Sequence, residues 1–378
     1  MTLSKALSDT KQSTREIYPD RQNDLKNDPD KKVRNPRPVT RKKNFRPIIM
    51  CFAFVMLSWA NLAAQIEGKV SLGIHYTDNL FQLSDYDISR WKHDSENLDF
   101  VKTTDDLNIS TQIDIAYPIP YRWWTFTPSI TAKFNQNVSN TDKYRTDSLF
   151  RLRVDRYYWS LTALYGYYPY IYYRHYRDDG GTEENQKYSY ERNLYRAELV
   201  VRPLQKLTTF GNVRYEDLYY NQYFTEADGN RLTAELGTRY SFPSFSLQGS
   251  YSFREYDCTG YKELDENDGS YESNIYRGVL RLKQMPIQGN SIKQQSWQPY
   301  LELVREDRYY QGNDSWYGGR EYHIYNTTAG LRIKFKPSIK LSLDYLHIFR
   351  NVESPNASVL RLKEFSENRF SATLQYEF

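Results

Sequence analysis

Histidine is the side chain best suited to proton transfer near neutral pH, and this sequence contains five. They are scattered along the chain: His75, His93, His175, His323 and His347. No Gly-x-Ser-x-Gly, His-Glu-x-x-His or Walker-type phosphate loop accompanies them. Two cysteines, Cys51 and Cys258, are too few for a disulfide scaffold or a cysteine metal cluster. The acidic stretch 263–268 lacks the spacing of an EF-hand calcium loop. The sequence therefore predicts no enzyme, no cofactor and no metal.

Basic residues form the more regular pattern, because they recur at alternate positions between apolar ones. Those on the polar side of the alternation are Arg196, Arg202, Arg214, Arg231, Arg239, Arg254, Arg277, Arg281, Arg332, Lys334, Lys340 and Arg369. Acidic residues on the same side are fewer: Asp114, Glu198, Glu216, Glu235 and Asp344. Guanidinium groups recognise oxyanions through paired N–H donors, so this face is suited to anionic solutes.

The elements that carry these residues are β-strands. At the C-terminus, Phe370, Ala372, Leu374, Tyr376 and Phe378 alternate with polar residues, which is the period of a strand with one apolar face. The same alternation recurs in segments 70–76, 107–117, 126–134, 232–242, 245–254 and 325–335. No long stretch shows the period of 3.6 that is typical of an amphipathic helix.

The connections between the predicted strands are of two kinds. Short turns carry proline, at 117–120, 203–205, 242–244 and 336–338. Long polar loops separate them, at 78–103, 137–145, 178–187, 224–230, 258–270, 311–320 and 351–363. This predicts an all-β, transmembrane, antiparallel up-and-down β-barrel of about 14 strands, with 12 to 16 possible, whose termini and short turns face the periplasm. The alternation is least regular between 146 and 178, where its phase slips near Arg156.

Composition agrees with a barrel. The mean hydropathy of −0.80 excludes a polytopic helical membrane protein. Aromatic residues make up 16% of the chain, including 36 tyrosines, which favours a membrane interface. Aromatic residues near strand ends predict interfacial girdles, with sugar stacking as the alternative: Trp123, Trp124, Tyr157, Tyr158, Trp159, Tyr219, Tyr220, Tyr309 and Tyr310. A secreted β-sandwich remains the alternative fold, although its strands are usually shorter than these.

The first 64 residues indicate targeting. Segment 41–64 has a basic start, a short apolar run and small residues at its end, which predicts a signal peptide, with a signal anchor or a buried helix as the alternative. Residues 1–40 are polar and are interpreted as a disordered extension, or as untranslated sequence if the protein begins at Val39. The formal charge of +4 comes from this region, so a nucleic-acid partner has no electrostatic support. The predicted barrel spans 65–378.

The C-terminal segment resembles the closing strand of Gram-negative outer-membrane β-barrel proteins. The resemblance implies that Phe370, Leu374, Tyr376 and Phe378 form the signal that the barrel assembly machinery recognises. A second segment, Tyr76–Phe81, is similar to a Tyr-x-Asp-Asn-hydrophobic-Phe element of barrels in exopolysaccharide and capsule systems. The alternative for this segment is a polar turn in which Asp78 and Asn79 bond their own backbone.

These inferences predict a protein of the outer membrane with the lipid bilayer as its surroundings. The leading function is a passive porin-like channel, or the outer-membrane component of saccharide or exopolysaccharide transport, for an anionic solute or saccharide. The residues predicted to set selectivity in the lumen are Arg214, Arg231, Arg239, Arg254, Arg281, Arg332 and Lys334.

Three alternatives stay open for the function. The inward arginines pair with acids and close the interior; the barrel is sealed and its loops bind a partner or surface polymer; or the barrel is an enzyme. The enzyme alternative requires an Asp–His pair at the outer rim, for instance with His175.

Overall fold

The computed structural model describes residues 66–93, 98–177, 184–260, 268–287 and 295–378. These residues belong to one compact unit, Ala63–Phe378. The predicted extension 1–40, the start at Val39 and the signal peptide 41–64 lie outside the described residues, as does most of the acidic stretch 263–268. None of the helices in the described part of the chain has the length and hydropathy needed to cross a membrane.

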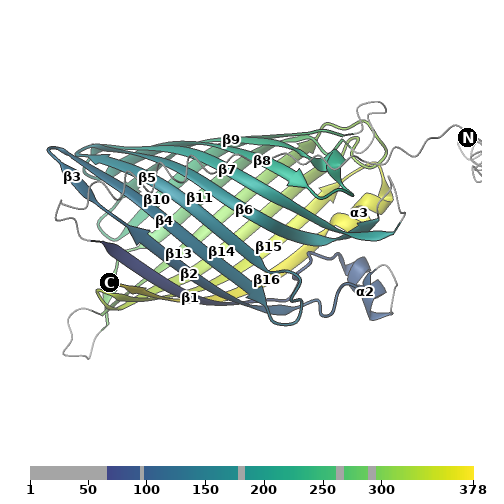
Figure 1. The fold of residues 1–378 in the computed structure, drawn as a ribbon, viewed down its shortest axis with the longest axis horizontal. Coiled ribbons are helices and arrows are strands. Elements are labelled where there is room, and N and C mark those ends of the chain that lie inside the picture. Colours follow the sequence, from purple (N-terminus) through teal and green to yellow (C-terminus); the bar gives the residue numbers. More distant parts are fainter. Residues whose placement is uncertain (1–65, 94–97, 178–183, 261–267, 288–294) are drawn as a thin grey trace, which may run out of the picture. The chain divides into compact units, whose positions relative to one another are not determined.

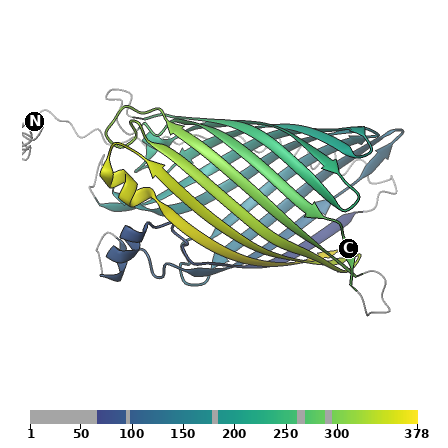
Figure 2. The same cartoon turned by 180° about the vertical axis from the view of Figure 1, so that it is seen from behind.

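The described residues form a closed, all-antiparallel barrel of 14 long strands (Figures 1 and 2). Each strand pairs with its sequence neighbour, β1 also pairs with β16, and β11 pairs with β13. The strands are β1 Glu67–Thr77, β2 Asp106–Ala116, β4 Trp124–Asn137, β5 Arg145–Arg156, β6 Trp159–Arg177, β7 Asn185–Leu204, β8 Leu207–Tyr220, β9 Gly229–Ser241, β10 Phe245–Cys258, β11 Tyr271–Leu282, β13 Ser296–Tyr310, β14 Glu321–Lys336, β15 Ile339–Glu353 and β16 Phe365–Glu377. The predicted fold class and the preferred strand number are confirmed.

Short elements mark the two ends of the barrel. At the end that carries the short connections, here called the turn end, β3 Ile119–Tyr121 and β12 Met285–Pro286 extend the sheet. At the opposite end, the loop end, lie α2 Asp85–Lys92, α3 Ala357–Lys363 and the 3₁₀ turn η2 Thr225–Ala227. Figure 1 shows α2 and α3 together at the loop end, whereas the C-terminus lies at the turn end.

The seam between β1 and β16 closes the barrel. Gly68 and Phe378 exchange backbone hydrogen bonds of 2.9 Å in both directions, and Val70 lies opposite Tyr376. Phe370, Leu374, Tyr376 and Phe378 all point outward and are exposed. A closed sheet leaves no unpaired edge, so these backbone groups are satisfied without water.

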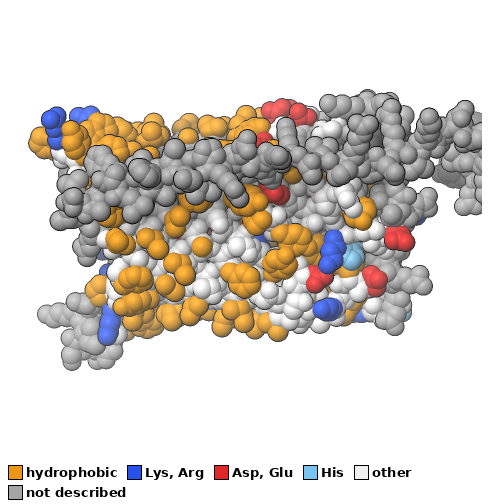
Figure 3. All heavy atoms as spheres, viewed as in Figure 1, with side chains coloured by type: hydrophobic (Ala, Val, Ile, Leu, Met, Phe, Trp, Pro, Cys, Tyr) orange, Lys and Arg blue, Asp and Glu red, His pale blue; other side chains and the backbone are white. Residues whose placement is uncertain are grey.

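The outer surface is apolar because the alternation places one side of every strand outside. Leu72, Ile113, Leu199, Leu236 and Leu343 are examples, and Leu236 is 71% exposed. Figure 3 shows hydrophobic side chains spread over this surface, with charged ones gathered mainly at its ends. Such a surface is stable against lipid and would aggregate in water.

The irregular region 146–178 has two structural causes. A tight turn at Tyr157–Tyr158 reverses the chain between β5 and β6, and this is why the phase slips near Arg156. Within β6, the register shifts between Tyr168 and Ile171, where Pro169 cannot donate a ladder hydrogen bond. Neither this turn nor the connection between β11 and β13 was among the turns and loops predicted from the sequence.

Candidate functional site

The strand register places eleven of the twelve basic residues of the predicted set on the inward face of the barrel. The exception is Arg202, which is exposed and lies where the register shifts between Val201 and Leu204. Arg214 lies opposite Arg196 on β7 and Thr233 on β9, while Arg239 lies opposite Gln248 on β10. Arg332 lies opposite Gln298, and Lys334 opposite Lys340. The lumen is therefore lined by basic side chains from β7 round to β16.

Carboxylates pair with the arginines midway along the wall. Glu216, whose side chain is 3% exposed, accepts from Arg231 Nε at 2.6 Å and from Arg192 Nη1 at 3.2 Å. Arg277 pairs with Glu302 at 3.0 Å. These contacts join neighbouring strands, so they hold the lumen charges in place.

The inward acids are more numerous than the sequence pattern indicated. Besides the predicted set, the register turns Asp147, Glu302, Glu306 and Glu367 inward. Glu306 binds Arg254 at 3.2 Å and Arg308 at 2.7 Å. Two of the residues predicted to set selectivity, Arg231 and Arg254, are therefore partly neutralised by neighbouring carboxylates.

A second set of arginines lies nearer the turn end, and we call Arg239, Arg281 and Arg332 the inner basic cluster. The Gln248 Oε1 atom accepts from Arg239 Nε at 3.2 Å and from Arg281 Nη1 at 3.3 Å, so one neutral amide holds both guanidinium groups. Arg332 stacks over the Tyr300 ring at 5.0 Å. Within the ranges that the structure describes, none of the three forms an ion pair with a carboxylate.

The loops at the loop end are folded elements rather than polar coil. Ser84 caps α2 by accepting from the Asp87 amide at 3.1 Å, and Asn356 caps α3 in the same way. A first buried core consists of Phe81, Leu83, Leu98, Val101 and Tyr172, and a second of Tyr322, Val352 and Val359. The apolar residues of the long loops thus serve to pack them against the barrel.

The segment Tyr76–Phe81 takes part in this packing. Asn79 bonds the backbone of Leu83 in both directions at 2.8 Å, as the polar-turn alternative required. Asp78 departs from that alternative, because its carboxylate accepts from the amide and the side chain of Asn368 at 2.7 Å. The segment therefore ties the first loop to β16.

Four cations that the sequence pattern did not indicate meet at the loop end: Arg174, Arg320, Arg350 and Lys363, here called the outer basic cluster. They come from the end of β6, the residue before β14, β15 and the last residue of α3. The charge of each was visible in the sequence. Their proximity was not, because three of them lie in loops or beyond a break in the alternation.

The Asp–His pair at the rim does not involve His175, the residue that the sequence analysis considered for it. His175 packs on the Phe100 ring at 4.6 Å, and its buried Nε2 has no hydrogen-bond partner. The Asp–His pair that forms is His323 with Asp307, whose Nδ1 and Oδ1 atoms are 2.7 Å apart. In the part of the chain that the structure describes, the hydrogen-bond and ion-pair partners of His323 are carboxylates, and no serine or cysteine hydrogen-bonds to it.

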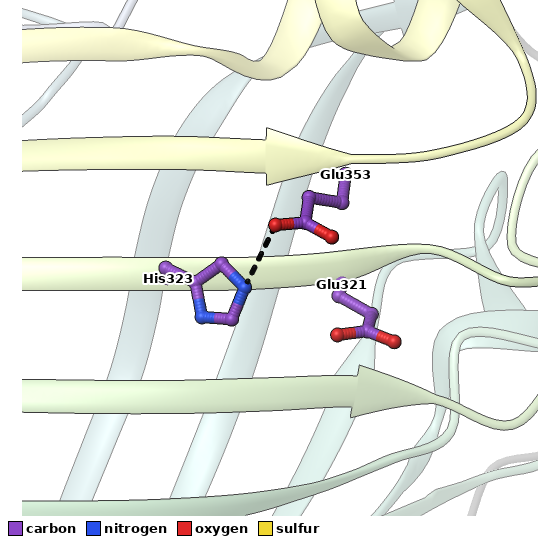
Figure 4. Close-up of side chains that lie close together, drawn as sticks. All are labelled: Glu321, His323 and Glu353. Atoms are coloured by element: carbon purple, nitrogen blue, oxygen red, sulfur yellow. Dashed lines mark ion pairs between the residues drawn. The ribbon is translucent and has the colours of Figure 1, made fainter.

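The same histidine belongs to a group with the donor atoms of a metal site. Glu321, His323 and Glu353 place ligand atoms within 4.8 Å of one another on the outside of the rim (Figure 4). The His323 Nε2 atom lies 3.4 Å from Glu353, and its Nδ1 atom binds Asp307. Ion pairing among these side chains accounts for the arrangement without a metal ion.

The strand-end aromatic residues divide between two roles. Trp123, Tyr157 and Tyr158 at the turn end and Tyr219 and Tyr309 at the loop end are exposed on the outside, as a girdle requires. Tyr220 and Tyr310 point inward and pack in the buried clusters around Leu218 and Tyr322. Neighbouring residues such as Tyr219 and Tyr220 face opposite sides of the sheet, because successive side chains of a strand point to alternate faces.

Known proteins match this chain in architecture alone. No family model matches the sequence, and no curated protein matches it. Among solved structures, the anion-selective porin from Comamonas acidovorans has 8% identity and a TM-score of 0.43, covering 84% of this chain and 99% of the porin. A bacterial polysaccharide outer membrane secretin has 10% identity and a TM-score of 0.42, covering 82% and 98%. OmpT, an outer membrane protein of Vibrio cholerae, has 8% identity and a TM-score of 0.42, covering 83% and 97%.

A barrel can keep this outline while its lumen changes, so the functions of those proteins are not transferred to this chain. The closed barrel and its apolar exterior are those of bacterial outer-membrane proteins. This chain therefore has the fold of a transmembrane β-barrel.

Proposed function

We propose that this protein is a passive channel for anionic solutes or acidic saccharides in the outer membrane. The observation that carries the proposal is the inner basic cluster. Arg239 and Arg281 share the neutral amide of Gln248, and Arg332 stacks on the Tyr300 ring, so all three have neutral partners in place of carboxylates. A barrel of 14 strands is wide enough to enclose water, because barrel diameter grows with strand number.

The unpaired charges would act on any ion that enters. Rings of fixed positive charge at the wall of a narrow lumen lower the energy of an anion and raise that of a cation. Arg231 and Arg254 would contribute less to anion selectivity than arginines without a counter-charge, because Glu216 and Glu306 offset their charge. Selectivity is therefore assigned mainly to Arg239, Arg281 and Arg332, with Arg214 and Lys334 beside them.

The test is conductance of the refolded chain from Gln65 to Phe378 in a planar bilayer with a salt gradient. The expected result is steady conductance with a reversal potential that indicates anion preference. Converting both Arg239 and Arg332 to Glu is expected to reverse the sign of that potential. The matched control is Lys187→Gln at the rim, which removes an exposed cation that pairs with Asp142.

An unchanged reversal potential in the double variant would reject the selectivity assignment. Absence of conductance from barrels that are demonstrably inserted would reject the channel. That second result would favour a sealed barrel that displays its loops for binding, for which the two packed cores at the loop end are the supporting observation.

A further inference from the structure

The outer basic cluster is assembled from opposite sides of the barrel. Arg174 belongs to β6, and Lys363 belongs to α3, which precedes β16; four strands separate β6 from β16 in the sheet. Lys363 Nζ nevertheless lies 3.4 Å from the Tyr176 hydroxyl of β6, and Arg350 Nε donates to the Lys363 carbonyl at 2.7 Å. The end of α3 therefore reaches across the loop end of the lumen.

Three of the four cations of this cluster are buried, and Arg350 is partly buried. Arg320 is 5% exposed, Arg174 7% and Lys363 8%. The Nε and Nη1 atoms of Arg320 and the Nε atom of Arg174 are buried without any hydrogen-bond partner. A buried guanidinium that lacks partners is costly, so their presence calls for a group that completes their hydrogen bonds.

Carboxylates do not supply that group. Among the described residues, the acid in ion-pair contact with the cluster is Asp87 of α2, whose Oδ2 atom is 3.6 Å from Arg174 Nη1. Arg90 also binds Asp87 at 3.6 Å, so one carboxylate is shared by two guanidinium groups. Four cations thus face a single acid, and the cluster keeps a net positive charge.

Aromatic rings form the walls instead. Arg320 lies 4.3 Å from the Tyr310 ring and 4.5 Å from the Tyr322 ring, and Arg350 lies 4.7 Å from Tyr322. Lys363 Nζ lies 5.0 Å from the Tyr176 ring and 5.2 Å from Trp316. Stacking holds the cations in place but leaves N–H donors in the plane of each guanidinium group available to a ligand.

We propose that the outer basic cluster is a binding site for an oxyanion group at the loop end of the lumen. Such a group is carried by a free inorganic oxyanion or by the acidic substituents of a saccharide. Its oxygens accept from the unpaired N–H groups of Arg320 and Arg174, and Lys363 supplies a further charge. Hydroxyl and ring surfaces of the surrounding tyrosines suit the sugar to which the charged groups are attached.

The state of Lys363 agrees with this assignment. Burial, and after it the neighbouring Arg174, Arg320 and Arg350, lowers the pKa of Lys363 well below its usual value. A bound oxyanion would reverse this effect, because an opposite charge favours the protonated amine.

The experiment measures binding to the refolded chain from Gln65 to Phe378 in detergent by isothermal titration calorimetry. The probes are sulfate and an oligomer of galacturonic acid, which separate a free oxyanion from an acidic saccharide. The expected result is one binding site per chain, with affinity reduced at least tenfold by Arg320→Gln and by Lys363→Gln. Lys187→Gln, which removes a cation from the same end of the barrel, is expected to bind as the unchanged chain does.

Folding of each variant is checked by the heat-modifiable migration of the intact barrel, and Lys363→Gln serves if Arg320→Gln does not fold. Binding of neither probe, or equal binding by both cluster variants, would overturn the proposal. Binding in detergent does not require an open pore. A chain that binds the probes but does not conduct would therefore reject the channel and support this site. A chain that conducts but does not bind the probes would support the channel and reject this site.

Discussion

The middle of the barrel wall and the outer basic cluster use the same residue type in opposite ways. In the wall, Glu216 receives Arg231 and Arg192 at 2.6 and 3.2 Å, and Glu306 likewise receives two arginines. At the loop end, Arg320 has four aromatic rings within 5.9 Å and buried nitrogen atoms without partners. Each of these wall arginines thus has a carboxylate partner, although the Nε atoms of Arg192 and Arg254 are also buried without a hydrogen-bond partner. Arg320, in contrast, forms no ion pair with any of the described carboxylates.

The difference separates structural charges from charges that are available to a ligand. Breaking a buried ion pair leaves an uncompensated charge, so removing one partner of a wall pair lowers the stability of the barrel. An arginine that already lacks a counter-charge contributes little to stability and is retained at a cost. A substitution that neutralises a charge should therefore lower the free energy of unfolding in the wall and raise it in the outer basic cluster.

The largest effect is expected from Glu216→Gln. This substitution leaves Arg231 and Arg192 without their shared carboxylate, and the free energy of unfolding should fall by about 3 kcal/mol. The measurement is reversible urea unfolding of the refolded barrel in detergent. Glu255→Gln, on the exposed outer face of β10, is the matched control and should change stability by less than about 0.5 kcal/mol. A fall equal to that of the control would remove the distinction between the two regions.

The opposite sign is expected from Arg320→Met in the outer cluster. Methionine keeps much of the apolar contact with Tyr310 and Tyr322 while removing an unpaired buried charge. The free energy of unfolding without ligand should rise by about 1 kcal/mol. The same urea experiment measures it, and a loss of more than about 1 kcal/mol would mean that the guanidinium is satisfied in the free protein.

Asp87→Asn should sharpen the comparison, because it removes the acid that faces the outer cluster. Loss of this negative charge beside Arg174 should strengthen sulfate binding by about tenfold, which corresponds to about 1.4 kcal/mol. Calorimetric titration of the variant against the unchanged chain measures the effect. Weaker binding would show that Asp87 orients the cluster rather than opposing the ligand.

The smallest effect is the dependence of sulfate affinity on pH. The pKa of Lys363 lies below its usual value because of burial and then of the neighbouring cations, and a bound anion raises it. Affinity should therefore increase as pH falls, by at most about tenfold per pH unit, and level off below the pKa of the free amine. Sulfate is the probe because its own charge does not change in this range.

Other groups that face Lys363 are Asp87 of α2, Tyr176 of β6, Trp316 and the guanidinium groups of Arg174, Arg320 and Arg350. Measurements between about pH 6 and about pH 9, made on the unchanged chain and on Lys363→Gln, separate the contribution of the lysine from that of these groups. A slope that persists in Lys363→Gln would assign the pH dependence to another group.

Local alternation was sufficient to predict much of the fold. Residues such as Leu232, Ala234 and Leu236 alternate with Arg231 and Thr233, and a strand between lipid and lumen must show this pattern. The prediction failed where the chain reverses without proline at Tyr157–Tyr158 and where Pro169 interrupts β6. A tight turn between two apolar strands leaves little signal beyond a slip in phase.

The candidate sites were predicted less completely. The face that carries Arg239, Arg281 and Arg332 follows from strand periodicity, but their shared contact with Gln248 depends on the register between β9, β10 and β11. Likewise, the inward acids Glu302 and Glu306 were overlooked because the sequence analysis assigned no alternation of faces to the segment 296–310. Without that strand, Arg254 has no visible partner.

The sequence by itself determined that strands span the membrane and which side chains of each strand face the lumen, because a period of two assigns every residue to a face. Only the tertiary structure decided which charges meet. The barrel closes through contacts between the ends of the chain, and α3 carries Lys363 across to β6. These contacts between residues that are distant in the sequence depend on the strand register, on loop packing and on the curvature of the closed sheet. None of the three can be deduced from the local sequence around a single residue.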